Sequence, residues 1–258
     1  RASAPHKSPM STASVITRRW THWRTEHASQ ITDLRRGLYR FTRNRLSVVG
    51  LALVLLLVLV AISAPAWVPY PEDATGKVNM SQRLKPPGAD HLFGTDEAGR
   101  DVFTRTILAT RTSLQVGVII LVVAISIGVT LGAIAGYFGG WVNQIIMRLT
   151  DIMLTFPGIF LALAITAALG RGMVNAMLAL SVTWWPGYCR LVEAMVLKVR
   201  EEDYVLGARA IGAGSRWVIW RHILPNLLTP IIVKASMDFG FAVLSIAALG
   251  FIGVGVQP

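Results

Sequence analysis

Residues 201–226 read EEDYVLGARAIGAGSRWVIWRHILPN, and the rest of the chain is arranged around this stretch. It is the one long polar and basic interruption between apolar runs that still has the pattern of ordered structure. Residues 204–211 predict a short helix, and the glycines of the Gly212-Ala213-Gly214 run interrupt it. Ser215 is a suitable N-cap for a second short helix over residues 216–224. The sequence therefore predicts two short helices joined by a bend.

The second predicted helix carries an apolar ridge with a basic rim. Trp217, Trp220 and Leu224 follow one another at i, i+3 and i+7, so they share one face of an α-helix. Arg216 and Arg221 leave that face. Bulky aromatic side chains on a surface are usually covered by a partner, so the ridge is expected to face either lipid or another protein.

These residues resemble the cytoplasmic coupling loop, the EAA loop, of binding-protein-dependent ABC importer permeases. The closest class is the peptide/nickel class, and within it the dipeptide permease C type. The general pattern is Glu-Ala-Ala, three residues, Gly, nine residues and Ile-x-Leu-Pro. Positions that keep the pattern are Ala208, Gly212, Leu224 and Pro225. Positions that depart from it are Leu206, Gly207 and His222.

The resemblance implies a loop that sits in a groove of a separate ATP-hydrolysing subunit and transmits its motion. It implies coupling roles for Tyr204, Ala208, Arg209, Gly212, Ala213, Ser215, Trp217, Trp220, His222, Leu224 and Pro225. The expected partners are a second homologous permease, an extracytoplasmic solute-binding protein, and either two ATP-binding subunits or one fused ATP-binding protein. ATP and magnesium would bind to those partners, and no cofactor is expected on this chain.

Composition predicts an all-α polytopic membrane protein. The chain has 258 residues, of which 53% are hydrophobic and 15% charged, and this is too apolar for a soluble domain. The net charge of +11 would suggest nucleic-acid binding in a soluble protein, but no nucleic-acid motif accompanies it. Ten of the 25 lysines and arginines precede residue 47, which predicts a cytoplasmic N-terminus in a bacterial cytoplasmic membrane.

Five apolar runs predict membrane-spanning helices, at residues 47–64, 116–137, 152–169, 173–191 and 229–256. The chain divides into three predicted regions: a polar tail over 1–28, a basic interfacial helix over 29–45 and a transmembrane domain over 46–258. The transmembrane domain contains an external loop over 65–112 and the coupling loop over 193–228. Residues 29–45 could instead extend the first span into the cytoplasm. The resembling family has six spans, so a last helix is expected beyond this sequence.

The external loop offers a choice between a metal site and structural turns. His91, Asp96, Glu97 and Asp101 are oxygen and nitrogen donors within a short segment. Their spacing does not match a calcium loop, and a single histidine makes a poor zinc site. Capping and turn roles are therefore expected for Asp96 and Asp101.

Three glycines in the second span lie one helical turn apart, at Gly128, Gly132 and Gly136. Small residues spaced in this way let two membrane helices approach closely, so the row predicts a helix contact face.

Two polar features of the spans are candidates for the transport pathway. Trp185 and Pro186 lie in a Trp-Trp-Pro-Gly run that is expected to interrupt the backbone hydrogen bonds of the fourth span. The run could form a broken helix that lines the pathway, or its tryptophans could belong to the aromatic belt at the membrane interface. Lys234 and Asp238 are spaced i, i+4 in the fifth span. Ionisable residues in a membrane helix are functional candidates, although this pair could be structural near the inner interface, where lysine can extend to water.

The sequence lacks a phosphate-binding motif, and this limits the classes of function to consider. The only Gly-Lys pair is Gly76-Lys77 in the external loop, so the chain has no phosphate-binding loop and is not expected to be an enzyme. The sequence predicts a permease subunit of an ABC importer for dipeptides or oligopeptides, with nickel or oligosaccharide uptake by the same machinery as the alternative. A proton-coupled secondary transporter is a more distant alternative.

Overall fold

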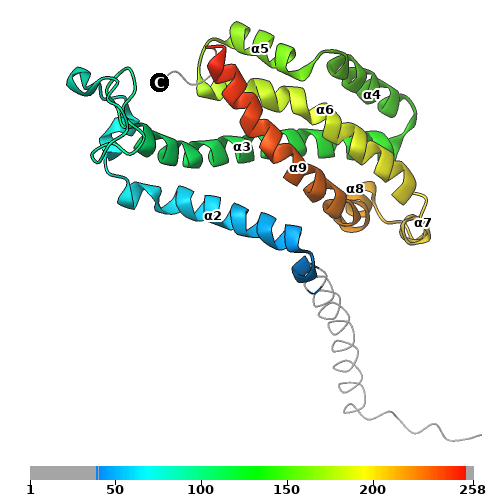
Figure 1. The fold of residues 1–258 in the computed structure, drawn as a ribbon. Helices are drawn as coiled ribbons and strands as arrows, with labels where there is room; N and C mark the ends of the chain where they lie inside the picture. Colours follow the sequence, from blue (N-terminus) through cyan, green and yellow to red (C-terminus); the bar gives the residue numbers. More distant parts are fainter. Residues whose placement is uncertain (1–38, 40, 254–258) are drawn as a thin grey trace, which may run out of the picture. The chain divides into compact units, whose positions relative to one another are not determined.

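The computed structural model describes residue 39 and residues 41–253. The predicted polar tail over 1–28 and most of the predicted interfacial helix over 29–45 lie outside the described residues. The helices are α2 (Arg45–Trp67), η1 (Pro71–Thr75), η2 (Met80–Gln82), α3 (Val102–Phe138), α4 (Gly140–Thr155), α5 (Gly158–Leu169), α6 (Met173–Val199), α7 (Asp203–Ala210), α8 (Ser215–Val218), η3 (Ile219–Ile223) and α9 (Leu224–Phe251). Over these residues the structure contains helices and no strand, as composition predicted (Figure 1).

The chain falls into two compact units that divide within α2, after Leu59. The first unit ends in the apolar part of α2, a 23-residue helix that contains the predicted span over 47–64. The second unit holds the remaining helices and every site described below.

Length and composition qualify several helices to cross a membrane. In the described part of the chain these are α2, α3, and the continuous run Ser215–Phe251. The pair α4 and α5 qualifies as a single span bent by 92°. The bend falls where Phe156 adopts an extended backbone and Pro157 precedes the first residue of α5. Since proline lacks an N–H, it fits this helix start. The third predicted span therefore begins inside α4 and crosses the bend.

Helix α6 lies at the centre of the second unit, in contact with α3, α4, α5 and α9 (Figure 1). It is 27 residues long but does not qualify as a span by apolar composition. Its neighbours contribute to this, because a helix in contact with other helices can carry a polar residue such as Glu193, which accepts a hydrogen bond from Asn143 of α4. The expected interruption near Pro186 is wrong: α6 runs through this proline as one helix.

The most extensive helix pairing joins α3 to α6. The three glycines of the predicted row lie on this contact. A Cβ atom at Gly128 would stand 2.5 Å from the Trp185 carbonyl oxygen, and one at Gly136 would stand 2.7 Å from Val196 Cβ. At Gly132 the added atom would overlap the Cys189 carbonyl oxygen. The two helices therefore approach each other closely because side chains are missing along this face.

Candidate functional site: the loop between α6 and α9

The bend after α7 is a Schellman turn centred on Gly212. This residue has φ of +86°, in the left-handed region that favours glycine. Its N–H donates to the Arg209 carbonyl (3.0 Å), and the Ala213 N–H donates to the Ala208 carbonyl (3.1 Å). A Cβ atom at Gly212 would meet nothing within 4 Å. Glycine is therefore required here by the backbone angle and not by crowding.

The second short helix does not end at Pro225, as the sequence predicted. Residues 215–251 form one continuous helix that contains a π turn over Ile219–Ile223. The Leu224 N–H donates to the Ile219 carbonyl, five residues earlier. Proline would clash with the carbonyl four residues before it in a regular α-helix, and the wider turn immediately ahead of Pro225 relieves that clash.

The π turn also changes which side chains share a face. A groove of about 910 Å³ between α3 and the α8–α9 run is lined by Arg216, Trp220 and Leu224, but not by Trp217. Residues four apart align because the π turn has more residues per turn than an α-helix. Of the predicted ridge, Trp220 and Leu224 line this groove, whereas Trp217 contacts His222, with ring centroids 4.6 Å apart.

A buried apolar cluster fastens the loop to three membrane helices. We call it the coupling core, and its members are Ala133, Val192, Val196, Val205, Ala208, Val218, Ile223, Leu227 and Ile231. They come from α3, α6, α7, α8, η3 and α9. Protein interiors are close-packed and transmit strain, so a push on α7 or α8 is carried directly to the membrane helices.

Polar contacts at the helix ends next to the loop accompany the coupling core. Arg200 Nη1 donates to the Gly136 carbonyl oxygen (2.8 Å) at the end of α3. The Asn143 amide of α4 donates to Glu193 Oε1 of α6 (2.6 Å). The guanidinium of Arg209 lies 5.7 Å from the Tyr137 ring centroid, within cation–π range. Arg200 and Arg209 thus tie the loop to α3, and Asn143 ties α4 to α6.

The predicted coupling residues divide into buried and exposed sets. Ala208 belongs to the coupling core, whereas Ala213, Ser215, His222 and Leu224 are partly buried. The exposed set consists of Tyr204, Arg209, Gly212, Trp217, Trp220 and Pro225. The Tyr204 side chain is fixed at its hydroxyl, which accepts a hydrogen bond from the Asn226 amide (3.0 Å).

Sequence reasoning missed two exposed apolar residues on the same loop. Leu206 lies on α7, and Ile211 follows it with 84% of its surface exposed. A large aliphatic residue directly before a helix-ending glycine was the available signal for Ile211. Together with Tyr204 and Trp217, these side chains form an apolar loop surface with no cover in the described chain.

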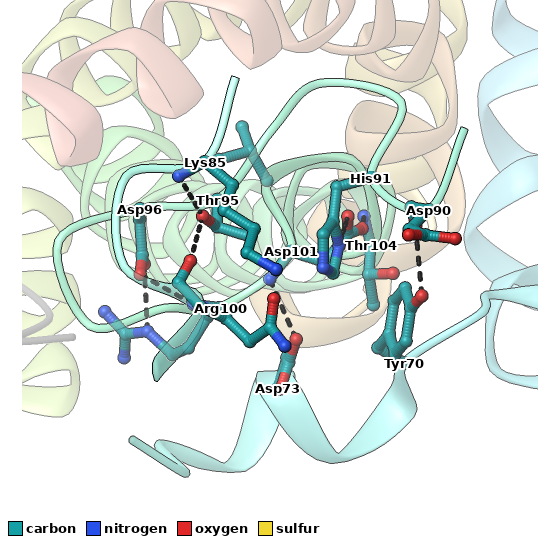
Figure 2. A network of polar contacts seen from close by, with 12 residues as sticks. Tyr70, Asp73, Lys85, Asp90, His91, Thr95, Asp96, Arg100, Asp101 and Thr104 are labelled. Carbon is teal, nitrogen blue, oxygen red and sulfur yellow. Dashed lines mark hydrogen bonds and ion pairs between the residues drawn. The ribbon is translucent and has the colours of Figure 1, made fainter. Parts of the chain in front are cut away.

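The external loop is organised by two aspartates (Figure 2). Asp101 is the N-cap of α3: it accepts from the Thr104 N–H (2.7 Å) and contacts His91 Nδ1 (2.9 Å). Its own N–H donates to Asp73 Oδ2 (2.8 Å). Burial raises the pKa of Asp101, but the hydrogen bonds from Thr104 and His91 outweigh it, and the pKa lies below its ordinary value.

Asp96 holds the adjoining turn. It accepts from the N–H groups of Ala98 (2.8 Å) and Arg100 (2.9 Å), and it pairs with the side chains of Arg100 (2.9 Å) and Arg105. Burial raises the pKa of Asp96, but these hydrogen bonds from Arg100 and Ala98 outweigh it and lower the pKa overall. The geometry gives both aspartates the capping and turn roles expected from the sequence.

The pathway candidates lie in two different settings. Trp185 and Pro186 are buried within α6, where the Trp185 carbonyl faces α3. Lys234 and Asp238 form an ion pair on α9 (2.9 Å) and are partly exposed. The Lys234 ammonium also lies 5.1 Å from the ring centroid of Tyr188 on α6.

Comparison with known proteins adds the family. Residues 128–258 match the model of the binding-protein-dependent transport system inner membrane component. The chain belongs to this family of transport permeases. Residues 32–87 of the permease match the N-terminal transmembrane domain of oligopeptide transport permease C. The resemblance read from the coupling loop is thereby confirmed, and so is a multi-pass membrane protein.

Curated relatives cover most of the permease. A dipeptide transport system permease protein of Alkalihalophilus pseudofirmus is 44% identical over 227 residues, which are 88% of this chain and 74% of the relative. A glutathione transport system permease protein of Pectobacterium atrosepticum is 38% identical over 85% of this chain and 72% of its own length. An oligopeptide transport system permease protein of Bacillus subtilis is 35% identical over 85% of this chain and 71% of its own.

Proposed function

We propose that this permease is one of two homologous membrane subunits of an ABC importer that carries short peptides. The observation that carries the proposal is the coupling core, which joins an exposed apolar loop surface to α3, α6 and α9. A loop built in this way suits a motor subunit that binds outside and drives the helices inside. The relatives support peptides as cargo, since their names specify dipeptide, glutathione and oligopeptide transport.

The motor is proposed to be either two ATP-binding subunits or one fused ATP-binding protein, which also holds the magnesium. It would seat Tyr204, Leu206, Ile211 and Trp217 in a groove, because apolar side chains of this size gain most from burial by a partner. When ATP closes the motor, the contacts with the loop change. The free energy that opens the pathway comes from the difference in interaction free energy between the motor and the loop in the closed and open states.

The rest of the assembly follows from topology. With the coupling loop in the cytoplasm, the N-terminus is also cytoplasmic, and the loop over 65–112 faces outward, where the solute-binding protein docks. The hydrogen bonds of Asp96 and Asp101 hold this outer loop in one shape for such docking. A second permease encloses the pathway together with this one, and this chain binds no cofactor itself.

Reconstitution tests the proposal. The permease is co-purified with its neighbouring subunits, placed in liposomes, and supplied with binding protein loaded with labelled dipeptide. We expect uptake that requires ATP and survives a proton ionophore, and mass spectrometry should find peptide on the binding protein isolated from cells. Uptake driven by a proton gradient without ATP would establish a secondary transporter instead. Nickel or an oligosaccharide on the binding protein would replace peptide as the cargo.

A further inference from the structure

We place the ion pair between Lys234 and Asp238 near the middle of the membrane by counting residues along α3. The Lys234 ammonium is over the ring of Tyr188, and Tyr188 Cβ would stand 2.6 Å from a Cβ atom at Gly128 on α3. Gly128 precedes Phe138, the last residue of α3, by ten residues, or about 15 Å at 1.5 Å per residue. Half of a hydrocarbon core of about 30 Å is the same distance. On this count the pair lies deeper than the inner-interface position that the sequence offered as an alternative.

Lys234 is held at this depth by two groups. Its ammonium is 2.9 Å from Asp238 Oδ2, one turn further along α9. It also lies within cation–π range of the Tyr188 ring, which is fully buried in α6. The lysine stem passes beside Gly187, next to this tyrosine, where an added Cβ atom would stand 3.7 Å from Lys234 Cε, an ordinary contact distance. The side chain is thus fixed across α9 and α6 and does not extend toward the membrane surface.

Both charged groups remain partly open. The Lys234 side chain is 34% exposed and that of Asp238 is 17% exposed in the second unit. Charged side chains at this depth almost always face a bundle interior or a water-filled cavity, because contact with lipid is costly. An exposed pair with both signs offers an acceptor and a donor to the same ligand. Only one carboxylate is present, so the pair is a poor cation site by comparison.

We propose that Lys234 and Asp238 form a mid-membrane site that takes the two charged ends of a zwitterionic peptide as it passes. The proposal rests on the proposed function, since it requires peptide as the solute. Asp238 accepts the peptide ammonium while Lys234 donates to the peptide carboxylate, so each protein charge exchanges one partner for another. No charge is left unpaired at the midplane during this exchange, which lowers the barrier to passage.

The test compares neutral and conservative variants in the reconstituted importer. In the double variant Lys234→Met with Asp238→Asn, both charges are removed and the side-chain volumes are nearly kept. A merely structural ion pair replaced in this way is often neutral for stability. We expect uptake per assembled complex to fall by about 10-fold to 100-fold, from the loss of hydrogen bonds to charged groups. ATP hydrolysis stimulated by the binding protein should continue.

Controls separate this role from packing. Lys234→Arg keeps the positive charge and should retain most of the uptake. Ser236→Ala removes a hydroxyl on the same helix that only bonds back to the Ile232 carbonyl, and it should transport at the parent rate. Parent-level uptake by the double neutral variant would overturn the proposal and leave the proposed function intact. No peptide uptake by the parent complex would instead overturn the proposed function.

A second measurement decides the question if the double variant fails to assemble. Asp238→Cys and, separately, Met237→Cys are introduced with Cys189→Ser, which removes the single native cysteine. We expect a charged, membrane-impermeant thiol reagent to label Asp238→Cys in the assembled complex and to label Met237→Cys poorly, because we place the exposed Met237 on a neighbouring face of α9 that contacts lipid. Equal absence of labelling at both positions would show that no aqueous pathway reaches the pair.

Discussion

The close contact between α3 and α6 makes a measurable prediction at Gly132. In the variant Gly132→Ala the new methyl group would overlap the Cys189 carbonyl oxygen and stand 2.9 Å from Val192 Cβ. A carbonyl of a helix backbone cannot swing away as a flexible side chain can, so the helices must separate. Overpacking of this kind destabilises by about 1–3 kcal/mol. Alanine is favoured over glycine within a helix by about 1 kcal/mol, which offsets part of that loss.

The net loss expected for Gly132→Ala is therefore about 0–2 kcal/mol, and Gly132→Leu should exceed it because three further carbons must be placed. One kcal/mol corresponds to about 2–4 °C in midpoint for soluble proteins of this size. Gly240→Ala is the matched control, since an added Cβ atom there meets nothing within 4 Å. It should leave the midpoint unchanged or raise it slightly.

Cys189 supplies the assay. Its thiol is buried, and its backbone is the contact point of Gly132. The assembled complex is heated in detergent with a thiol-reactive label, and mass spectrometry follows labelling of the peptide that contains Cys189. Labelling should begin at lower temperature in Gly132→Leu than in the parent and in Gly240→Ala. Identical labelling curves for Gly132→Leu and the parent would refute the close contact.

Three further predictions concern the loops. Gly212→Leu forces a side chain to adopt φ of +86°, at about 1–2 kcal/mol, and should uncouple ATP hydrolysis from uptake while insertion is normal; parent uptake would contradict this. Trp217→Ala should reduce recovery of the motor in pull-downs, whereas Trp220→Ala should not, because Trp220 lines the groove against α3; equal losses would restore the single ridge. Asp101→Ala should speed hydrogen exchange in the first turn of α3 at neutral pH by loss of the cap. The folded pKa of Asp101 is lowered from 3.8, so its stabilisation of the start of α3 is present above pH 3.8 and fades in the parent as the pH falls through the folded pKa. If hydrogen exchange in the first turn of α3 does not change in the parent below pH 3.8, the result argues against the cap.

Helix positions were predictable because burial in lipid leaves a strong pattern. A run of apolar residues long enough to cross the membrane identifies α2 and α3 without any knowledge of their neighbours. The same pattern is weaker for α6, whose polar residues are tolerated because other helices surround it. Sequence alone located α6 but could not show that it is the central helix, since that depends on contacts from four other segments.

The sequence-based expectations at two prolines were wrong, and a third proline lies at a bend. Pro157 marks a true bend, where the residue before it is extended. Pro186 and Pro225 lie inside continuous helices. At Pro225 the π turn accommodates the ring, and Pro186 lies where α6 packs against the glycine face of α3. The sequence shows where a proline ring would clash with the carbonyl four residues before it, but the tertiary structure determines whether the helix bends, widens or continues there.

The depth of the Lys234–Asp238 pair was beyond sequence reasoning for a related reason. Counting residues along α9 from Pro225 does not give the depth of the pair in the membrane, because the continuous helix begins earlier, at Ser215. Depth becomes readable only through Tyr188 and Gly128, which connect α9 to α6 and α6 to α3. The same two contacts connect the pair to the coupling core, because α3 and α6 contribute residues to both. Under the proposed function, a motor that displaces the loop would act on α6 and α9 through this cluster, and these helices carry Tyr188 and Lys234.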